Sequence, residues 1–159
     1  GQSTFITVTR EMIKEDLGCI CGFIHRAGGL AGVHSCDAVD WSILCECSLD
    51  IINLDAYNFG TSLFPYAREL GGFLRRGGVI AWGMVPTSEK AWEEDVGSLL
   101  ARWKGLVSGL VQRGVPEDLL LTQSMITPAC GTGLLHPELA ARIYRLTRLL
   151  SERVRGEVY

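Results

Sequence analysis

The sequence predicts an α/β domain of about four parallel strands, each followed by a turn and mostly by a helix. Short apolar runs of strand length alternate along the whole chain with longer segments whose apolar residues recur at the helical period. Twice, a helical segment ends in a glycine pair, Gly28-Gly29 and Gly77-Gly78, directly before an apolar run. Alternating helices and strands imply parallel pairing with right-handed crossovers.

The first helix and the first two strands come from residues 9–54. Residues 9–27 are predicted to be helical, because apolar residues such as Met12 and Phe23 follow the helical period up to the glycine stop. The run LAGVH at 30–34 is expected to be a strand buried on both faces. The run DIINL at 50–54 is the second predicted strand.

The second half of the chain repeats this order. Residues 64–76 are predicted to form a helix, and VIAWGMV at 79–85 the third strand. Thr87 is expected to cap a helix that runs to Gly114. After a short turn, SMIT at 124–127 is the fourth strand, and Pro137 occupies the first position of a closing helix.

Chain length limits the architecture. A closed eight-stranded barrel needs about 250 residues, so four units in 159 residues correspond to half of a (β/α)8 barrel. A free-standing open sheet of four or five strands is the alternative. Because the chain starts with Gly1 and opens on a helix, we expect residues 1–159 to be a single half-barrel segment of a longer or processed chain.

Charge and hydropathy exclude two classes of partner. The chain has 15 basic and 18 acidic residues and no basic stripe, which argues against nucleic-acid binding. No apolar stretch reaches the roughly 18 residues needed to cross a bilayer, and the first residues lack the pattern of a secretion signal. We therefore expect a soluble, cytoplasmic protein that does not bind membranes.

The six cysteines are spaced as reduced thiols or metal ligands, not as a disulfide framework. Cys19, Cys21, Cys45 and Cys47 lie within helical apolar patterns, where a free cysteine behaves as a small hydrophobic residue. Two cysteines remain for chemistry, Cys36 and Cys130.

Metal-ligating residues follow the predicted strands. In a parallel sheet the carboxyl ends of the strands share one edge, where ligands bind. His34 and Cys36 follow the first strand, Asp55 the second and Cys130 the fourth, a donor set that suits tetrahedral Zn²⁺. The alternative is that both cysteines are buried thiols and His34 bonds to the backbone.

Two further residues are candidate substrate contacts. Asn58 follows the second strand and is a candidate polar contact near the metal. Trp82 ends the third strand and is a candidate wall of a methyl-donor pocket, although tryptophan in such a domain more often serves packing.

The charge of the predicted metal site favours sulfur chemistry. Two thiolates, one carboxylate and Zn²⁺ leave one net negative charge, so the site is poor at polarising a carbonyl. It is suited to holding an incoming thiol as a nucleophilic thiolate, which would displace water or Asp55. The expected reaction is therefore alkyl transfer to a thiol.

Five segments carry a family resemblance: VHSCDAVDWSIL, DIINLDAYNF, GGVIAWGMVPTS, ITPACGTGLL and LTRLLSERVR. Together they resemble the carboxyl-terminal part of the cobalamin-independent methionine synthase superfamily, most closely its short core members. The resemblance implies a (β/α)8 TIM barrel whose zinc site activates homocysteine for methylation to methionine. It implies His34, Cys36 and Cys130 as ligands and Asp55 in the carboxylate place, with Glu46 as the alternative carboxylate.

The chain departs from the family pattern at two places. Asp55 stands where the long enzymes have Glu, which is one methylene longer. Met84 stands where they have a His that assists the folate leaving group, and Met cannot transfer a proton. We therefore expect a methyl-corrinoid or a corrinoid protein as the methyl donor, since reduced cobalt leaves without an acid.

The expected function is thus zinc-dependent S-methyl transfer to homocysteine or a related thiol. One alternative is a metal-free decarboxylase of the uroporphyrinogen decarboxylase clan. Another is a non-catalytic half-barrel that binds a metal or a partner. In each case we expect a first half-barrel or a second copy of the chain to cover the open strand edges.

Overall fold

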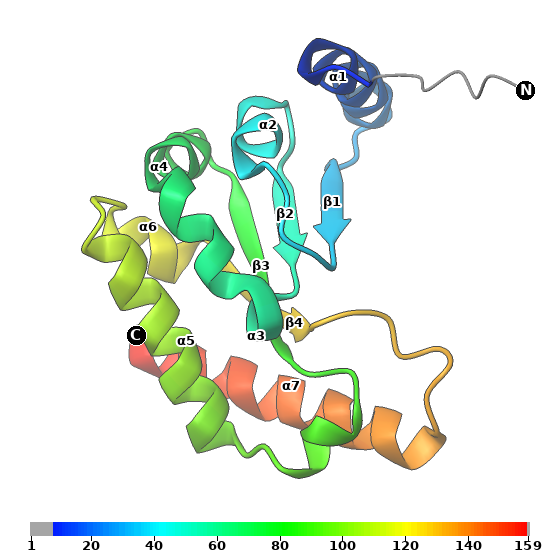
Figure 1. Cartoon of the computed structure of the whole chain (residues 1–159), viewed down its shortest axis with the longest axis vertical. Helices are drawn as coiled ribbons and strands as arrows, with labels where there is room; N and C mark the ends of the chain where they lie inside the picture. The colour runs from blue at the N-terminus through cyan, green and yellow to red at the C-terminus, as the bar shows by residue number, and fades with distance from the viewer. Residues whose placement is uncertain (1–7, 159) are drawn as a thin grey trace, which may run out of the picture.

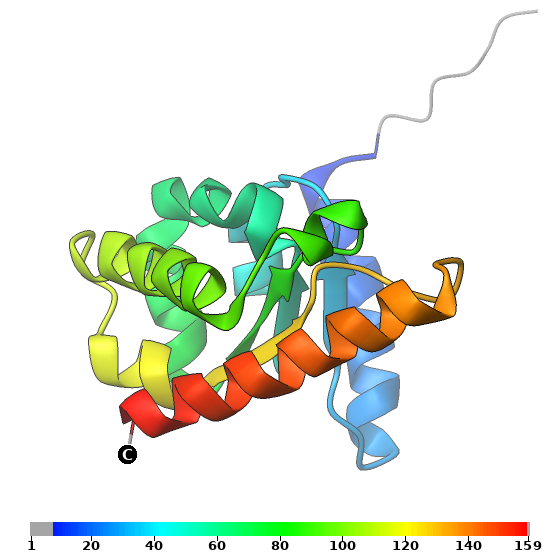
Figure 2. The same ribbon diagram turned by 90° about the horizontal axis from the view of Figure 1, so that it is seen from below.

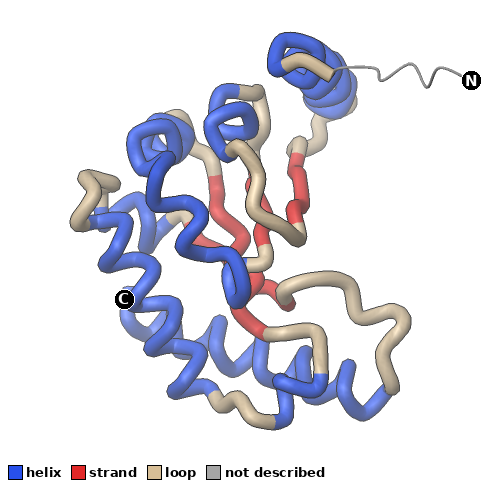
Figure 3. Tube along the Cα trace, in the orientation of Figure 1, coloured by secondary structure: helices blue, strands red, loops and turns tan. Residues whose placement is uncertain are grey.

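The computed structural model describes residues 8–158, which form a parallel sheet with helices around it (Figure 1). Coloured by element type, the strands lie in the middle of the molecule, and loops join them to the surrounding helices (Figure 3). The elements in chain order are α1 (Arg10–Arg26), β1 (Gly32–Ser35), α2 (Trp41–Glu46), β2 (Ile51–Leu54), α3 (Ala56–Phe59), the 3₁₀ segment η1 (Gly60–Tyr66), α4 (Ala67–Arg75), β3 (Val79–Val85), the 3₁₀ segment η2 (Glu89–Trp92), α5 (Val96–Val111), α6 (Glu117–Thr122), β4 (Ser124–Pro128) and α7 (Pro137–Val158).

The sheet has the order β1-β2-β3-β4, and all three strand pairs are parallel. This confirms the predicted α/β class and the four predicted strands. Figure 2 shows α7 running past β4, while α1 lies beyond β1 at the other end of the sheet. The arrangement is consistent with half of a barrel.

Local signals set the predicted helix ends. The side chain of Thr9 accepts a hydrogen bond from the backbone N–H of Met12 and caps α1. Gly28 and Gly77 adopt positive φ angles of 78° and 93° after α1 and α4. Only glycine takes this conformation without steric cost, which is why both helices end there.

The start of α5 differs from the prediction. Thr87 does not cap it; residues Glu89–Trp92 form a separate 3₁₀ turn, and α5 begins at Val96. Asp95 and Ser98 form a capping box, in which each side chain bonds to the backbone N–H of the other residue. The capping box gives hydrogen-bond acceptors to the backbone N–H groups of Asp95 and Ser98, which have no partner within the helix. Thr87 makes no such pair, so the helix begins after Asp95.

One continuous apolar core lies between the sheet and the helices. Three of its largest fully buried side chains are the indoles of Trp41, Trp82 and Trp103. Along β2 the buried residues Ile52 and Leu54 alternate with the half-buried Ile51 and Asn53. The helices therefore cover the face of the sheet that carries Ile52 and Leu54 more completely than the other face.

β1 is not the doubly buried strand that its apolar sequence predicted. Its residues alternate between exposed and half-buried, with Gly32 and His34 exposed. In the described part of the chain β1 pairs only with β2, so it is an edge strand. Its open face is the one that Asn53 shares, because His34 and Asn53 are register partners.

The four cysteines that were predicted to lie in helical apolar patterns differ in their burial. Cys21, Cys45 and Cys47 are buried as predicted, whereas Cys19 is exposed on α1. Burial raises the pKa of Cys45 to about 12, so its thiol stays protonated at neutral pH. All six cysteines are free thiols. Among the described helices, none combines the length and apolar character needed to cross a membrane.

Candidate metal centre

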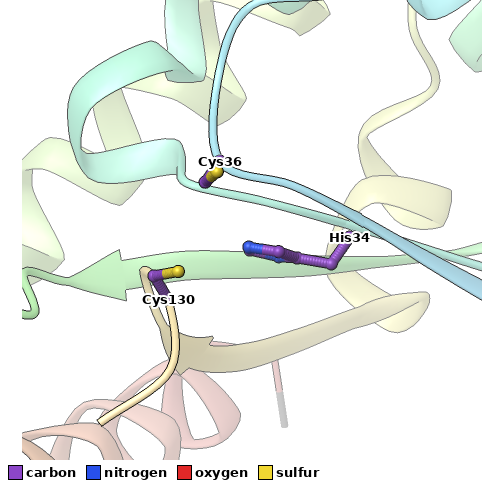
Figure 4. Close-up of side chains that lie close together, drawn as sticks. All are labelled: His34, Cys36 and Cys130. Carbon is purple, nitrogen blue, oxygen red and sulfur yellow. The ribbon is translucent and has the colours of Figure 1, made fainter. Parts of the chain in front are cut away.

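Three of the four predicted metal ligands lie together at the carboxyl edge of the sheet. One ligand atom each from His34, Cys36 and Cys130 lies within 4.8 Å of the other two. Figure 4 shows the nitrogen end of the His34 ring directed toward the space between the two thiols. All three side chains are exposed, so a metal and a substrate can reach them from solvent.

Parallel strand register brings these residues together. His34 lies in β1, and Cys36 follows one residue after that strand ends. Cys130 comes two residues after the last residue of β4, Pro128. β2 and β3 lie between β1 and β4, so the two chain segments must approach each other across the strand ends. A turn of the β4 end toward β1 is therefore required.

Gly83 permits that turn. Between Gly83 and Val85 the register of β3 against β4 shifts, so that Pro128 pairs with Val85. A Cβ atom on Gly83 would lie 2.4 Å from the carbonyl oxygen of Leu54 and 2.8 Å from the Cα atom of Ala129. Only glycine allows this close approach, which carries the β4 end over the sheet one residue before Cys130.

A shallow cavity of about 300 Å³ adjoins the cluster on the open face of the sheet. Two of the three candidate ligands line it, together with residues from β2, β4, the loop after β4 and α7. Its lining residues are His34, Asn53, Thr127, Pro128, Cys130, Gly131, Thr132 and Tyr144. The hydroxyls of Thr132 and Tyr144 lie 2.7 Å apart, which joins the loop to α7.

The sequence did not single out Asn53, which contacts a candidate ligand directly. Its Oδ1 atom lies 2.5 Å from Nδ1 of His34. Its position in DIINL was the available signal, because a polar residue inside an apolar strand requires partners. Those partners come from other strands and become visible only once the strands are paired.

Asp55 is not part of the group, although it was predicted as the carboxylate ligand. It is 7% exposed and caps α3. Its Oδ1 accepts the backbone N–H of Asn58 at 2.9 Å, and its Oδ2 accepts Nδ2–H of Asn58 at 2.7 Å. Both oxygens are therefore engaged by Asn58, the predicted polar contact, which is itself exposed.

The other two predicted candidates also lie elsewhere. Glu46, the alternative carboxylate, accepts hydrogen bonds from Lys14 and Arg10 of α1, and these bonds lower its pKa. Trp82 is fully buried and donates its Nε1–H to Ser124 at 2.8 Å. Its side chain belongs to the core and does not line the cavity, so packing explains it.

The donor set of the cluster suits a zinc ion. Zn²⁺ is held by imidazole nitrogen and thiolate sulfur in tetrahedral geometry, and sites with three protein ligands keep a fourth position for water or substrate. One nitrogen and two sulfurs from exposed side chains fit this open type of site. Carboxylate-preferring ions such as Mg²⁺ fit these donors poorly.

Comparisons of the whole chain with protein-family models, with curated proteins and with solved structures find no match.

Proposed function

We propose that this chain is the zinc-bearing part of an S-methyltransferase of methionine synthase type. Its acceptor is the thiol of homocysteine or a related small thiol. The observation that carries the proposal is that His34 and Cys36, from β1 and the loop after it, lie beside Cys130, which follows the opposite outer strand, β4. The sequence resemblance to the cobalamin-independent methionine synthase superfamily adds the reaction.

The electrostatics of the cluster support thiol chemistry. A Zn²⁺ ion held by two thiolates and a neutral imidazole would supply the charge that keeps a bound thiol deprotonated near neutral pH. The exposed side chains leave room for the acceptor on the solvent side of the cluster. The cavity lined by Thr127, Thr132 and Tyr144 adjoins the same ligands and can take the rest of a small acceptor.

The methyl transfer needs no external oxidant or reductant. The acceptor gives its proton to water, and its sulfur attacks the methyl carbon. An S–C bond forms, and the bond between methyl and donor breaks with its electron pair left on the donor. In-line attack requires the acceptor sulfur to be held in place, which is the task of the cluster.

The donor proposed here is a methyl-corrinoid, free or carried by a protein. Met84 is fully buried and has no proton to give to a leaving group. An amine leaving group such as that of methyl-folate needs such an acid, whereas reduced cobalt does not. The remaining contacts to the acceptor and the donor are assigned to a first half-barrel.

The open strand edges support a partner of that kind. Within residues 8–158, β1 and β4 each pair on one side only. Met125 of β4 is 49% exposed, and His34 of β1 is exposed on the same face. A further half-barrel or a second copy of the chain would supply the missing strands and cover this face.

Two measurements on the complete protein test the proposal. Elemental analysis is expected to find about one zinc per chain, and Cys36→Ser and Cys130→Ser are expected to lose it. Cys19→Ser is the matched control, because Cys19 is also exposed but lies on α1. Methyl transfer to homocysteine is then measured with methylcobalamin and, in parallel, with methyl-folate.

Each alternative predicts a different result. A metal-free decarboxylase-like barrel would contain no zinc and would not depend on Cys130. A metal-binding or partner-binding module would hold zinc but transfer no methyl group from either donor. Transfer from methyl-folate alone would overturn the donor assignment and leave the reaction class standing.

A further inference from the structure

A row of hydrogen bonds runs across the four strands beside the cluster. His34 of β1, Asn53 of β2 and Ala81 of β3 are register partners, so their side chains lie on the same face of the sheet. Thr127 of β4 pairs with Gly83, two residues further along β3, and lies on that face too. Asn53 stands in the middle of this row and bonds to all three neighbours.

The backbone sets the orientation of the Asn53 amide. One amide atom lies 2.7 Å from the carbonyl oxygen of Ala81, which can only accept a hydrogen bond. That atom must therefore be Nδ2, since an oxygen at this distance would repel the carbonyl. The second N–H of Nδ2 is donated to Oγ1 of Thr127 at 2.9 Å.

The orientation of the amide then decides the tautomer of His34. With Nδ2 directed toward β3 and β4, Oδ1 faces Nδ1 of His34 at 2.5 Å. An amide oxygen only accepts hydrogen bonds, so Nδ1 must carry the proton. The remaining ring nitrogen, Nε2, is left with a lone pair. It belongs to the ring end that Figure 4 shows directed toward Cys36 and Cys130.

We propose that Asn53 is a positioning residue that holds His34 in the Nδ1–H tautomer and thereby presents Nε2 to the metal before it arrives. This inference rests on the proposed zinc site. A ligating histidine commonly donates its other N–H to an oxygen acceptor, and loss of that acceptor weakens metal binding about 10–100-fold. Here the acceptor is itself aligned by the backbone of β3.

The tautomer is measured first, in metal-free protein. The chain has three histidines, so ¹⁵N-histidine labelling with His34→Gln assigns the His34 signals. At about pH 8, where imidazole is neutral, Nδ1 of His34 is expected to show the shift of a protonated nitrogen. An Nε2–H tautomer in the wild type would overturn the proposal.

Two variants separate positioning from stability. Asn53→Leu removes the acceptor, so His34 is expected to leave the pure Nδ1–H state and zinc affinity to fall about 10–100-fold. Asn53→Asp also loses the bond donated to the carbonyl of Ala81, although its carboxylate can accept a hydrogen bond from the Thr127 hydroxyl, and it keeps an oxygen facing His34. It is expected to retain the tautomer and bind zinc more tightly than Asn53→Leu. Equal zinc affinity of the two variants would overturn the role of the acceptor.

A control variant and the wild type complete the test. Ser124→Ala removes a hydrogen bond to Trp82 within the same sheet and is expected to change neither the tautomer nor zinc affinity. A shift of His34 in this control would show that general destabilisation moves the tautomer, which overturns the proposal. Wild-type protein that has the Nδ1–H tautomer but binds no zinc would overturn the proposed function and not the tautomer.

Discussion

Gly83 of β3 and Ala129 after β4 approach so closely that no side chain fits between them. A Cβ atom on Gly83 would lie 2.8 Å from the Cα atom of Ala129. Ala129 is buried, and its backbone N–H donates to the carbonyl of Val85 at 2.8 Å. The contact therefore determines where the next residue, Cys130, leaves the sheet.

Gly83→Ala is expected to weaken zinc binding and to lower stability. The added methyl group meets backbone atoms of Leu54 and Ala129, which cannot rotate away, so the segment before Cys130 must move. Overpacking of this kind costs about 1–3 kcal/mol in the free energy of unfolding. Urea denaturation and zinc competition with a chelator measure the two effects.

Gly72→Ala is the matched control for that variant. Gly72 lies exposed in α4, and a Cβ atom built there meets nothing within 4 Å. Alanine in a helix is favoured over glycine by about 0.5–1 kcal/mol, so this control should be more stable and bind zinc normally. Unchanged zinc affinity in Gly83→Ala would show that the close contact does not position Cys130.

Asp55→Asn is expected to leave zinc affinity unchanged. Asn is as good an N-cap as Asp, so α3 keeps its cap while the carboxylate charge disappears. Because both oxygens of Asp55 already accept hydrogen bonds from Asn58, we expect no coordination by this residue. A tenfold or larger loss of affinity on isothermal titration would instead place Asp55 among the ligands, as the resemblance implies.

Alkylation should divide the six thiols by their exposure. At neutral pH, iodoacetamide is expected to modify the exposed Cys19, Cys36 and Cys130. Cys45 should resist, because burial raises its pKa to about 12 and leaves almost no thiolate. Peptide mass spectrometry resolves the sites.

Zinc supplies the control in the same experiment. Added zinc should protect Cys36 and Cys130, whose thiolates become ligands, and should leave the modification of Cys19 unchanged. Equal protection of all three exposed thiols would indicate a general conformational effect. No protection at all would contradict the metal site.

The pair formed by His25 and Asp50 makes a pH-dependent contribution to stability. Nε2 of His25 lies 2.7 Å from Asp50, which also accepts the backbone N–H of Ala31. The bond to His25 holds the pKa of Asp50 below its ordinary value of 3.8. A lowered carboxyl pKa stabilises the fold above the ordinary value, and this stabilisation is lost as the pH falls through the folded-state pKa.

Asp50→Ala is therefore expected to cost about 1 kcal/mol near pH 7, since the side chains are partly exposed and screened by solvent. The difference from the wild type should shrink as the pH is lowered below 3.8. Thermal melts of both proteins across this range measure it. A difference that stays constant down to strong acid would show that the charge of Asp50 plays no part.

Much of the fold follows from local patterns in the sequence. The glycine stops at Gly28 and Gly77 and the helix start at Pro137 were predicted from the sequence. They depend on the conformational preferences of single residues and their near neighbours. The start of α5 was misplaced, because the capping pair Asp95 and Ser98 competes with Thr87 and wins through two hydrogen bonds.

Some residues of the candidate metal centre could likewise be predicted from the sequence, and others could not. His34, Cys36 and Cys130 could be named from the sequence, because strand ends of a parallel sheet share one edge and few residue types bind zinc. Trp82 could not be assigned, since the choice between core and cavity depends on which face of β3 it occupies. Asp55 was named as the carboxylate ligand from the sequence; in the structure it caps α3 and lies outside the group formed by the other three candidates.

The sequence by itself determined the number of strands, their parallel order with helices and the chemical type of the candidate ligands, since these depend on periodicity and side-chain chemistry. Only the tertiary structure decided how the candidate ligands meet. The close approach at Gly83 and the row from His34 through Asn53 to Thr127 join residues far apart in the chain. Such contacts depend on the register between strands distant in sequence, which is fixed only when the strands pair and bury one face of the sheet.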